Sequence, residues 1–330
     1  IYEYSELALN IVTVVGMSTA FFAASVALVQ TDIKKIIAYS TCSQLGYMFF
    51  AAGVGAYNVA MFHLFTHAFF KALLFLGSGS VIHAFKDEQN INNMGGVWRK
   101  LPYTYTLMII GTLALTGFPL LSGFYSKDAI IEFAYLSGST TGYYAAGIGI
   151  FTAFLTSIYS WRLMFKTFHG QYNNKEIKIE ETHESPLIML IPLIILSIGA
   201  IFAGFIFKDL FLGYGGINNF WNRSIFFLEP LSSDHPPLWF LILTPTLVIL
   251  SIPLAYYLFI KNKNFPTQLV NINKPLYEFL LNKWYFDEIY DTLFVKSSKR
   301  LGLFLWKFFD IKVIDGFGPD GISGLIKKFS

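Results

Sequence analysis

The segment HLFTHAFFKALLFL, residues 63 to 76, carries three ionisable side chains in apolar surroundings: His63, His67 and Lys71. Residues four apart lie on one face of an α-helix, so this spacing predicts a single polar stripe. Histidine titrates close to neutral pH. A charge at the centre of a bilayer costs on the order of 3 kcal/mol, so a lysine there needs a reason. We interpret the stripe as a relay that passes protons along one helix face.

Two other interpretations of the stripe rest on the histidines alone. His63 and His67 could bind a metal, but they supply only two of the three or four protein ligands that zinc requires. They could also hydrogen-bond neighbouring helices without any transport role. The relay is the interpretation that also accounts for Lys71.

A second lysine, Lys127, follows a predicted helix break in GFPLLSGFYSKDAI, residues 117 to 130. Pro119 removes a backbone donor, and a broken helix in a membrane is tolerated only inside protein or beside a wet cavity. Transporter sites often use such breaks. Asp128 is adjacent in sequence and points about 100° away, so it need not pair with Lys127. The alternative role for Lys127 is a helix-end lysine that reaches solvent.

The composition indicates an integral membrane protein. The chain has 330 residues, of which 54% are hydrophobic and 14% charged, against roughly 25% charged in soluble domains. The single Cys42 excludes a disulfide within the chain. We find no P-loop, dinucleotide-binding turn, CxxC or nucleophile elbow, so we expect no cofactor on this chain. We also find no basic cluster typical of nucleic-acid binding.

Seven apolar segments are long enough to cross a membrane, which takes roughly 20 residues each. The predicted fold is therefore all-α and integral to the membrane, with about seven transmembrane helices, one of them broken. The expected segments are 7–30, 36–56, 58–84, 103–136 (the broken one), 143–168, 187–206 and 238–260.

The loop charges predict an orientation. If the seven segments alternate, one side of the membrane receives only Lys208 and Arg223. The side with more basic residues is expected to face the cytoplasm or matrix. That side receives Lys34, Lys35, Lys86, Arg99, Lys100, Arg162, Lys166, Lys175, Lys178, Lys261, Lys263 and Lys274.

Residues 275–310 are too charged to cross a membrane. Their apolar residues recur at near-helical spacing with charged residues between them, which predicts a long amphipathic helix along the membrane surface or along other membrane helices. The alternative is a soluble tail helix that folds back on the chain's own loops. The apolar positions are Leu276, Leu280, Tyr290, Phe294, Leu301, Leu305 and Phe308.

A polar stretch enters the second predicted span. Its hydroxyls and amide could hold a short water chain that leads to His63, or could only hydrogen-bond other helices. Both interpretations stay open. The residues are Tyr39, Ser40, Thr41, Ser43 and Gln44.

The sequence resembles the largest antiporter-like membrane subunit (L/5-type) of proton-pumping NADH:quinone oxidoreductase, respiratory complex I. The matching motifs are QTDIKKIIAYSTCSQLGYMFF, FHLFTHAFFKALLFLGSGSVIH, GFPLLSGFYSKDAI, and NKWYFDEIYDTLFV followed by VIDG. By the resemblance, Lys34 matches the family's DIK lysine, and His63, His67 and Lys71 match its histidine–lysine helix. Lys127 matches the lysine of the second broken helix, at the exit towards the positive side.

The resemblance also implies an organisation. We expect the second five-helix antiporter-like repeat at 1–168, two further transmembrane helices at 169–260 and the amphipathic lateral helix region at 261–330. The motifs of the family's first repeat are not found, so we expect the exit half of a proton path on a fragment of a longer subunit.

The family implies partners and a location. The expected partners are the lipid bilayer and other membrane subunits of the complex, contacted partly through 275–310. The resemblance implies that quinone and NADH bind elsewhere in the complex and that no redox chemistry takes place on this chain. The location is the bacterial plasma membrane or the mitochondrial inner membrane. The alternatives are the large subunit of a cation/proton antiporter or membrane-bound hydrogenase, and a structural subunit without transport.

Overall fold

The computed structural model describes residues 5–174, 177–213, 220–222, 224–225, 236–262 and 264–330. The chain divides into two compact units, Ile1–Asn273 and Lys274–Ser330. Within the described residues the secondary structure is helical, apart from one isolated β-bridge between Asp32 and Asn90. The sequence-based expectations at Lys175, Arg223 and Lys263 lie outside the described residues.

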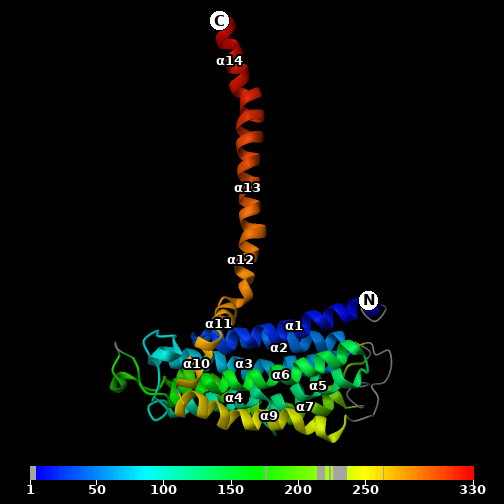
Figure 1. The fold of residues 1–330 in the computed structure, drawn as a ribbon, viewed down its shortest axis with the longest axis vertical. Helices are drawn as coiled ribbons and strands as arrows, with labels where there is room; N and C mark the ends of the chain where they lie inside the picture. Colours follow the sequence, from blue (N-terminus) through cyan, green and yellow to red (C-terminus); the bar gives the residue numbers. More distant parts are fainter. Residues whose placement is uncertain (1–4, 175–176, 214–219, 223, 226–235, 263) are drawn as a thin grey trace. The chain divides into compact units, whose positions relative to one another are not determined.

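The first unit is a bundle of long helices that lie side by side (Figure 1). Short polar residues begin several of them, since a side-chain oxygen can accept a bond from an unpaired N–H of the first turn. The Asp32 carboxylate accepts from the Lys35 amide, and the Ser139 hydroxyl accepts from the Gly142 amide. The helices are α1 (Glu6–Val29), α2 (Ile33–Gly53), α3 (Tyr57–Ala84), α4 (Pro102–Thr116), α5 (Ser122–Leu136), α6 (Thr140–Met164), α7 (Leu187–Leu212), α9 (Leu238–Tyr256) and α10 (Asn264–Ile272).

In the described part of the chain, five helices are long and apolar enough to cross a membrane. They are α1, α3, α6 continued by the π-helix Phe165–His169, α7, and α9 continued by the π-helix Tyr257–Lys261. The expected integral membrane fold is thus present. Helix α2 carries many polar side chains, and α4 and α5 have 15 residues each, so the count of seven spans stays a prediction.

The helix break lies where the sequence predicts it. Helix α4 ends at Thr116, and Gly117 follows with φ 82° and ψ 34°, a left-handed conformation in which glycine carries little steric cost. Helix α5 begins at Ser122 and passes so close to α4 that a Cβ atom on Gly123 would lie 1.8 Å from the Ala114 carbonyl oxygen. The segment expected at 103–136 is therefore two short, tightly packed helices.

Helices α1 and α2 also pack backbone against backbone. A Cβ atom on Gly16 would lie 2.4 Å from the Phe50 nitrogen, and one on Gly46 would lie 2.5 Å from the Ala20 nitrogen. The Ser43 hydroxyl donates to the Ala20 carbonyl across this contact (2.8 Å). This close packing fixes which residues of α2 face the interior.

Contacts between the loops join α1, α3, α6 and the segment before α7 at one end of the bundle. Lys86, just after α3, pairs with Glu181 (2.6 Å). The loop-charge prediction counted Arg162 with the loop residues, but Arg162 lies inside α6 and is buried. Its guanidinium donates to the Leu28 and Gln30 carbonyls at the end of α1 (2.8 Å each). This is the end that holds most of the basic residues.

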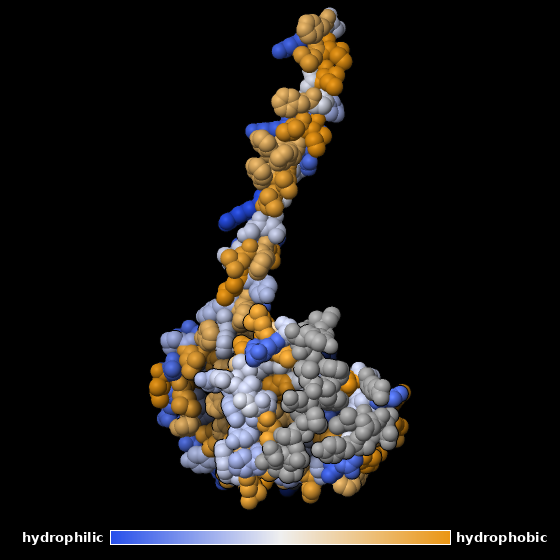
Figure 2. All heavy atoms as spheres, turned by 90° about the vertical axis from the view of Figure 1, so that its right-hand side faces the viewer, coloured by the Kyte–Doolittle hydropathy of each residue, from blue (hydrophilic) through white to orange (hydrophobic). Residues whose placement is uncertain are grey.

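The second unit is a succession of helical segments rather than one uninterrupted helix. Positive φ angles at Lys283, Trp284 and Tyr285 interrupt it, although NKWYF contains no glycine or proline. Within 274–330 no residue is buried, and apolar and polar side chains both line this unit (Figure 2). Its segments are α11 (Lys274–Leu281), α12 (Phe286–Tyr290), α13 (Lys296–Phe304) and α14 (Pro319–Phe329), joined by Lys283–Tyr285, Asp291–Val295 and Leu305–Asp315.

The division into 1–168, 169–260 and 261–330 is expected from the family resemblance and not from compactness. It stays a prediction. In the structure the first unit extends to Asn273, so α10 belongs to it. The lateral role of 275–310 also stays a prediction.

Candidate functional site

The predicted stripe on α3 lies inside the bundle. His63 is 0% exposed, His67 6% and Lys71 5%. Their four-residue spacing turns all three side chains inward, while Leu64 and Leu76 on the same helix are exposed. A helix of mostly apolar residues thus turns these three ionisable groups into the bundle, while His83 near its end is exposed.

Lys71 is held by a hydroxyl that it shares with a tyrosine. Its Nζ donates to the Ser40 Oγ (2.8 Å), and the Tyr159 hydroxyl donates to the same oxygen (2.7 Å). Ser40 comes from α2 and Tyr159 from α6, and both are 1% exposed. Three helices therefore meet at one buried oxygen atom.

His63 links the stripe to α5. Its Nδ1 lies 2.9 Å from the Ser126 Oγ, and its Nε2 lies 3.1 Å from the Gln44 Oε1. Because the Gln44 oxygen can only accept, Nε2 donates to it, and the Ser126 hydroxyl next to Nδ1 also contacts the Ser122 carbonyl (3.3 Å). Thr66 lies 2.7 Å from the same serine oxygen. The ring is therefore bound on both sides and is oriented across three helices.

His67 occupies the middle of the stripe without such bonds. Its Nε2 is buried and has no hydrogen-bond partner among the described residues. Its ring centre lies 6.0 Å from that of His63, and it meets the Phe70 ring edge-on at 5.3 Å. Since buried polar atoms are nearly always paired, an unpaired nitrogen here needs a functional or water-mediated explanation.

Lys127 is fully buried, one turn after the helix break. Its Nζ has no hydrogen-bond partner in the part of the chain that the structure describes. It lies 5.2 Å from the centre of the Tyr47 ring, a cation–π distance. The Tyr47 hydroxyl donates to the Gly149 carbonyl (2.5 Å), which fixes the ring. The role as a helix-end lysine that reaches solvent does not fit this burial.

Asp128 does not pair with Lys127. No ion pair between them is present among the described residues, and one carboxylate oxygen of Asp128 is buried without a hydrogen-bond partner. This agrees with the 100° that separates neighbouring side chains on a helix.

Lys34 lies apart from the other predicted site residues. It is exposed in the first turn of α2, next to Lys35, while Asp32 caps the helix. The structure brings His63, His67 and Lys71 together on α3 and connects them to α5 through Ser126, but it places Lys34 outside this group. Its assignment to the relay stays a prediction that rests on the DIK motif.

The partners of the stripe were only partly anticipated from sequence. Ser40 and Gln44 belong to the polar stretch, and both make interhelical hydrogen bonds to the stripe. Tyr159 and Ser126 were not expected. The run TSIYS at 156–160 places hydroxyl side chains within an apolar helix, which is a signal that could have identified Tyr159.

A small cavity adjoins the buried oxygen of Ser40. Its volume of about 10 Å³ is close to the space that one water molecule requires. Ser40, Thr112, Tyr159 and Ser160 are the polar residues of its lining, which is otherwise apolar. Separately, no group of three or more histidine, cysteine or acidic residues suited to a metal occurs within the described ranges.

Comparisons with known proteins show which family and relatives the sequence resembles. Residues 1–156 match the family described as NADH:quinone oxidoreductase/Mrp antiporter, TM. The chain is 46% identical over 337 residues to NADH-ubiquinone oxidoreductase chain 5 of Phytophthora infestans, covering 100% of this chain and 50% of the relative. It is 40% identical over 395 residues to NADH-quinone oxidoreductase subunit L of Rhodobacter capsulatus, covering 98% and 54%. The chain thus spans about half the length of these relatives.

A solved structure has a similar fold. A chain of the structure titled "Structure of Mrp complex from Dietzia sp. DQ12-45-1b" matches with a TM-score of 0.59 and 24% identity, over 75% of this chain and 27% of that one. At this identity the likeness concerns the fold alone.

Proposed function

Residues 1–156 match the NADH:quinone oxidoreductase/Mrp antiporter transmembrane family, and from this premise we propose that the chain is a member of it and moves protons as part of an NADH:quinone oxidoreductase. Quinone reduction on other subunits supplies the energy. This chain contributes the second antiporter-like repeat and the exit half of the path.

One observation carries the proposal: Lys71 and Lys127 are both buried in the bundle, and neither forms an ion pair within the described residues. A lysine that only stabilised the fold would be expected to have a carboxylate partner, because breaking or omitting the partner of a buried charge costs several kcal/mol. A lysine that gains and loses a proton does not need a permanent carboxylate partner.

The contacts support an order for the relay. Lys71 lies two helical turns from His63, with His67 between them. His63 contacts Ser126, the residue that precedes Lys127 in α5. A proton can thus pass from Lys71 by way of the two histidines to the level of Lys127. Water molecules at His67 and Lys127 would complete the chain of hydrogen bonds.

The membrane orientation forms part of the proposal. We assign α2 as a span and α4 with α5 as one broken span, which brings the count to seven. The end of the bundle that holds Lys86, Lys166 and the Arg162 contacts faces the cytoplasm or matrix, following the positive-inside rule. The protein then lies in a bacterial plasma membrane or a mitochondrial inner membrane.

The proposed partners are other membrane subunits of the complex, contacted partly by residues 275–310. The support is the exposure of the apolar positions predicted from the helical spacing, for example Tyr290 at 59% and Phe294 at 59%. Exposed apolar side chains in such a row need lipid or protein to cover them.

The test replaces Lys71 or Lys127 by methionine in the complete complex, which is reconstituted into liposomes. We expect fewer protons moved per electron pair in both variants. The control is Lys261→Met, which replaces an exposed lysine near the end of the same unit and should leave this ratio unchanged. An unchanged ratio in both variants would refute the relay.

A structural subunit would behave differently, because the loss of Lys71 would then lower the amount of assembled complex while its pumping ratio stayed normal. Measuring assembly and pumping on the same preparation separates the two functions.

A second candidate function is a subunit of an Mrp-type cation/proton antiporter, because the family that residues 1–156 match also includes the Mrp antiporter. Co-purification decides between them. Isolation with quinone-reducing subunits supports the oxidoreductase, and isolation with cation/proton exchange activity but no quinone reduction supports the antiporter.

A further inference from the structure

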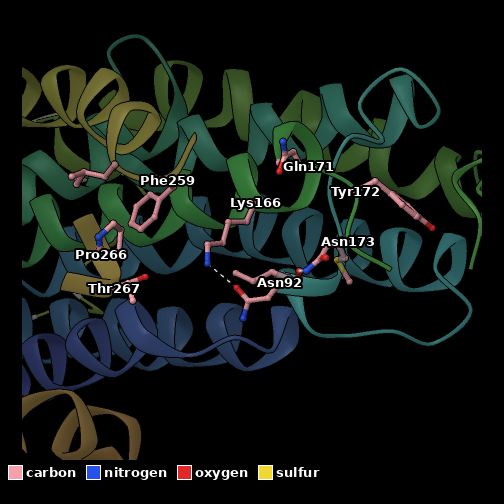
Figure 3. Close-up of a pocket in the computed structure, with 12 residues that line it drawn as sticks. Asn92, Lys166, Gln171, Tyr172, Asn173, Phe259, Pro266 and Thr267 are labelled. Carbon is pink, nitrogen blue, oxygen red and sulfur yellow. Dashed lines mark hydrogen bonds between the residues drawn. The ribbon is translucent and has the colours of Figure 1, made fainter. Parts of the chain in front are cut away.

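A cavity of about 390 Å³ opens at the basic end of the first unit, and none of its lining residues belongs to the proposed relay. This volume is within the usual range of small-molecule sites. Figure 3 shows its lining, which combines the end of α6, the segments 91–94 and 170–173, the end of the α9 span and the start of α10.

One side of the cavity is polar and carries a single positive charge. The Lys166 Nζ donates to the Asn92 Oδ1 (2.7 Å), and the Asn173 amide donates to the Asn92 carbonyl (3.1 Å). Figure 3 shows Lys166 reaching into the space beside Asn92 and Thr267. Lys166 makes no ion pair within the described ranges, and the lining contains no acidic residue.

The other side of the cavity is apolar. Leu258 and Phe259 come from the end of the α9 span, and Pro266 comes from α10. A charged group and an apolar surface therefore face the same space, an arrangement that suits an amphiphilic ligand better than a free ion.

The height of the cavity in the bundle points to the same class of ligand. Lys166 lies near the end of the span Thr140–His169, and Phe259 lies near the end of the span Leu238–Lys261. In the membrane orientation proposed above, both spans end where hydrocarbon gives way to lipid headgroups, and lysines at span ends place their charge at that level.

We propose that this cavity binds the phosphate of an anionic glycerophospholipid such as phosphatidylglycerol. Lys166 neutralises the phosphate, Asn92 and Thr267 offer hydrogen bonds, and an acyl chain lies along Leu258 and Phe259. A phosphatidylcholine fits less well, because its quaternary ammonium would lie close to the like charge of Lys166. The inference is independent of the proposed relay.

The test uses the intact complex purified in detergent and a phosphatidylglycerol with a photoreactive diazirine in its acyl chain. After irradiation, mass spectrometry should find the label on the peptide that contains Phe259. Lys166→Gln should lower this labelling about tenfold, the loss expected for a hydrogen-bonded charge. Lys166→Arg should retain it. The matched control Lys261→Gln removes an exposed charge at the same end and should leave labelling unchanged.

Competition on the wild-type complex tests the site even if Lys166→Gln fails to assemble. Unlabelled phosphatidylglycerol should displace the probe, and phosphatidylcholine should displace it much less. Displacement by inorganic phosphate as effective as by the lipid would reassign the site to a free anion and overturn the proposal. Equal losses in Lys166→Gln and Lys261→Gln, or no label near Phe259, would overturn it as well.

Discussion

Replacing Ser40 by alanine removes one oxygen atom on which two buried donors depend. Lys71 and Tyr159 both donate to it, at 2.8 and 2.7 Å. A buried donor that loses its acceptor costs about 1–3 kcal/mol, and a charged donor costs more. For the two donors together, Ser40→Ala should destabilise the subunit by roughly 2–6 kcal/mol.

Ser43 provides the matched control in the same helix. It is also buried, but its hydroxyl donates to the Ala20 carbonyl of α1, and no charged group depends on it. Ser43→Ala should therefore cost only about 1 kcal/mol, the net value of an ordinary hydrogen bond. Both substitutions remove a buried serine hydroxyl from α2, so they differ mainly in which hydrogen-bonding group loses its partner.

The assay measures two quantities on the reconstituted complex: the midpoint of thermal unfolding and the protons moved per electron pair. Ser40→Ala should lower both, because Lys71 loses the contact that holds it in place. Ser43→Ala should lower the midpoint slightly and leave the proton ratio unchanged. If the two variants pump equally well, the Ser40 contact has no part in proton transfer and our reasoning about Lys71 is wrong.

Two further predictions concern the packing of the bundle and its loops. Gly123→Ala forces a Cβ atom against the Ala114 carbonyl and should lower the free energy of unfolding by about 1–3 kcal/mol or more. The control Gly147→Ala adds a Cβ atom with nothing within 4 Å and should be neutral or slightly stabilising. The thermal unfolding midpoints of the two variants provide the comparison. The hydrogen bond and positive charge of Lys86 hold the pKa of the Glu181 carboxyl below its usual value. The contact therefore stabilises the loop above the ordinary carboxyl pKa and is lost as the pH falls through the lowered value, so the hydrogen-exchange protection factors of amides at 177–183, corrected for the intrinsic rate at each pH, should fall in acid. In Lys86→Met this pH dependence should disappear.

The sequence predicts those parts of the site that depend on local spacing. The inward stripe of His63, His67 and Lys71 follows from the helical period, and the break at Gly117 follows from the need for a residue that tolerates a positive φ. Both are visible within a few residues of chain. The burial of Lys127 also follows, since it lies in an apolar segment after that break.

The partners of these residues depend on how helices pack, and the sequence does not reveal them. Ser40 and Tyr159 are 119 residues apart, yet they share a hydrogen bond. Their contact requires α2 and α6 to present particular faces to each other, which the pattern of a single helix cannot specify. Lys34 illustrates the reverse, because the motif assigns it to the relay while the structure exposes it at the first turn of α2. The interruption of the helix at 283–285 could not be predicted either, because this segment contains no glycine or proline.

The break between α4 and α5 has an electrostatic consequence for Lys127. The amides of Gly117 and Phe118 bond the Ala114 and Leu113 carbonyls at the end of α4, and the aligned peptide dipoles of the helix place a partial negative charge there. A Cβ atom on Gly117, at that end of α4, would lie 3.9 Å from the Lys127 Cδ. The Lys127 side chain thus passes close to the negative pole of α4, a local dipole that a continuous helix would not place there. The helix terminus provides a partial counter-charge that cannot itself be protonated.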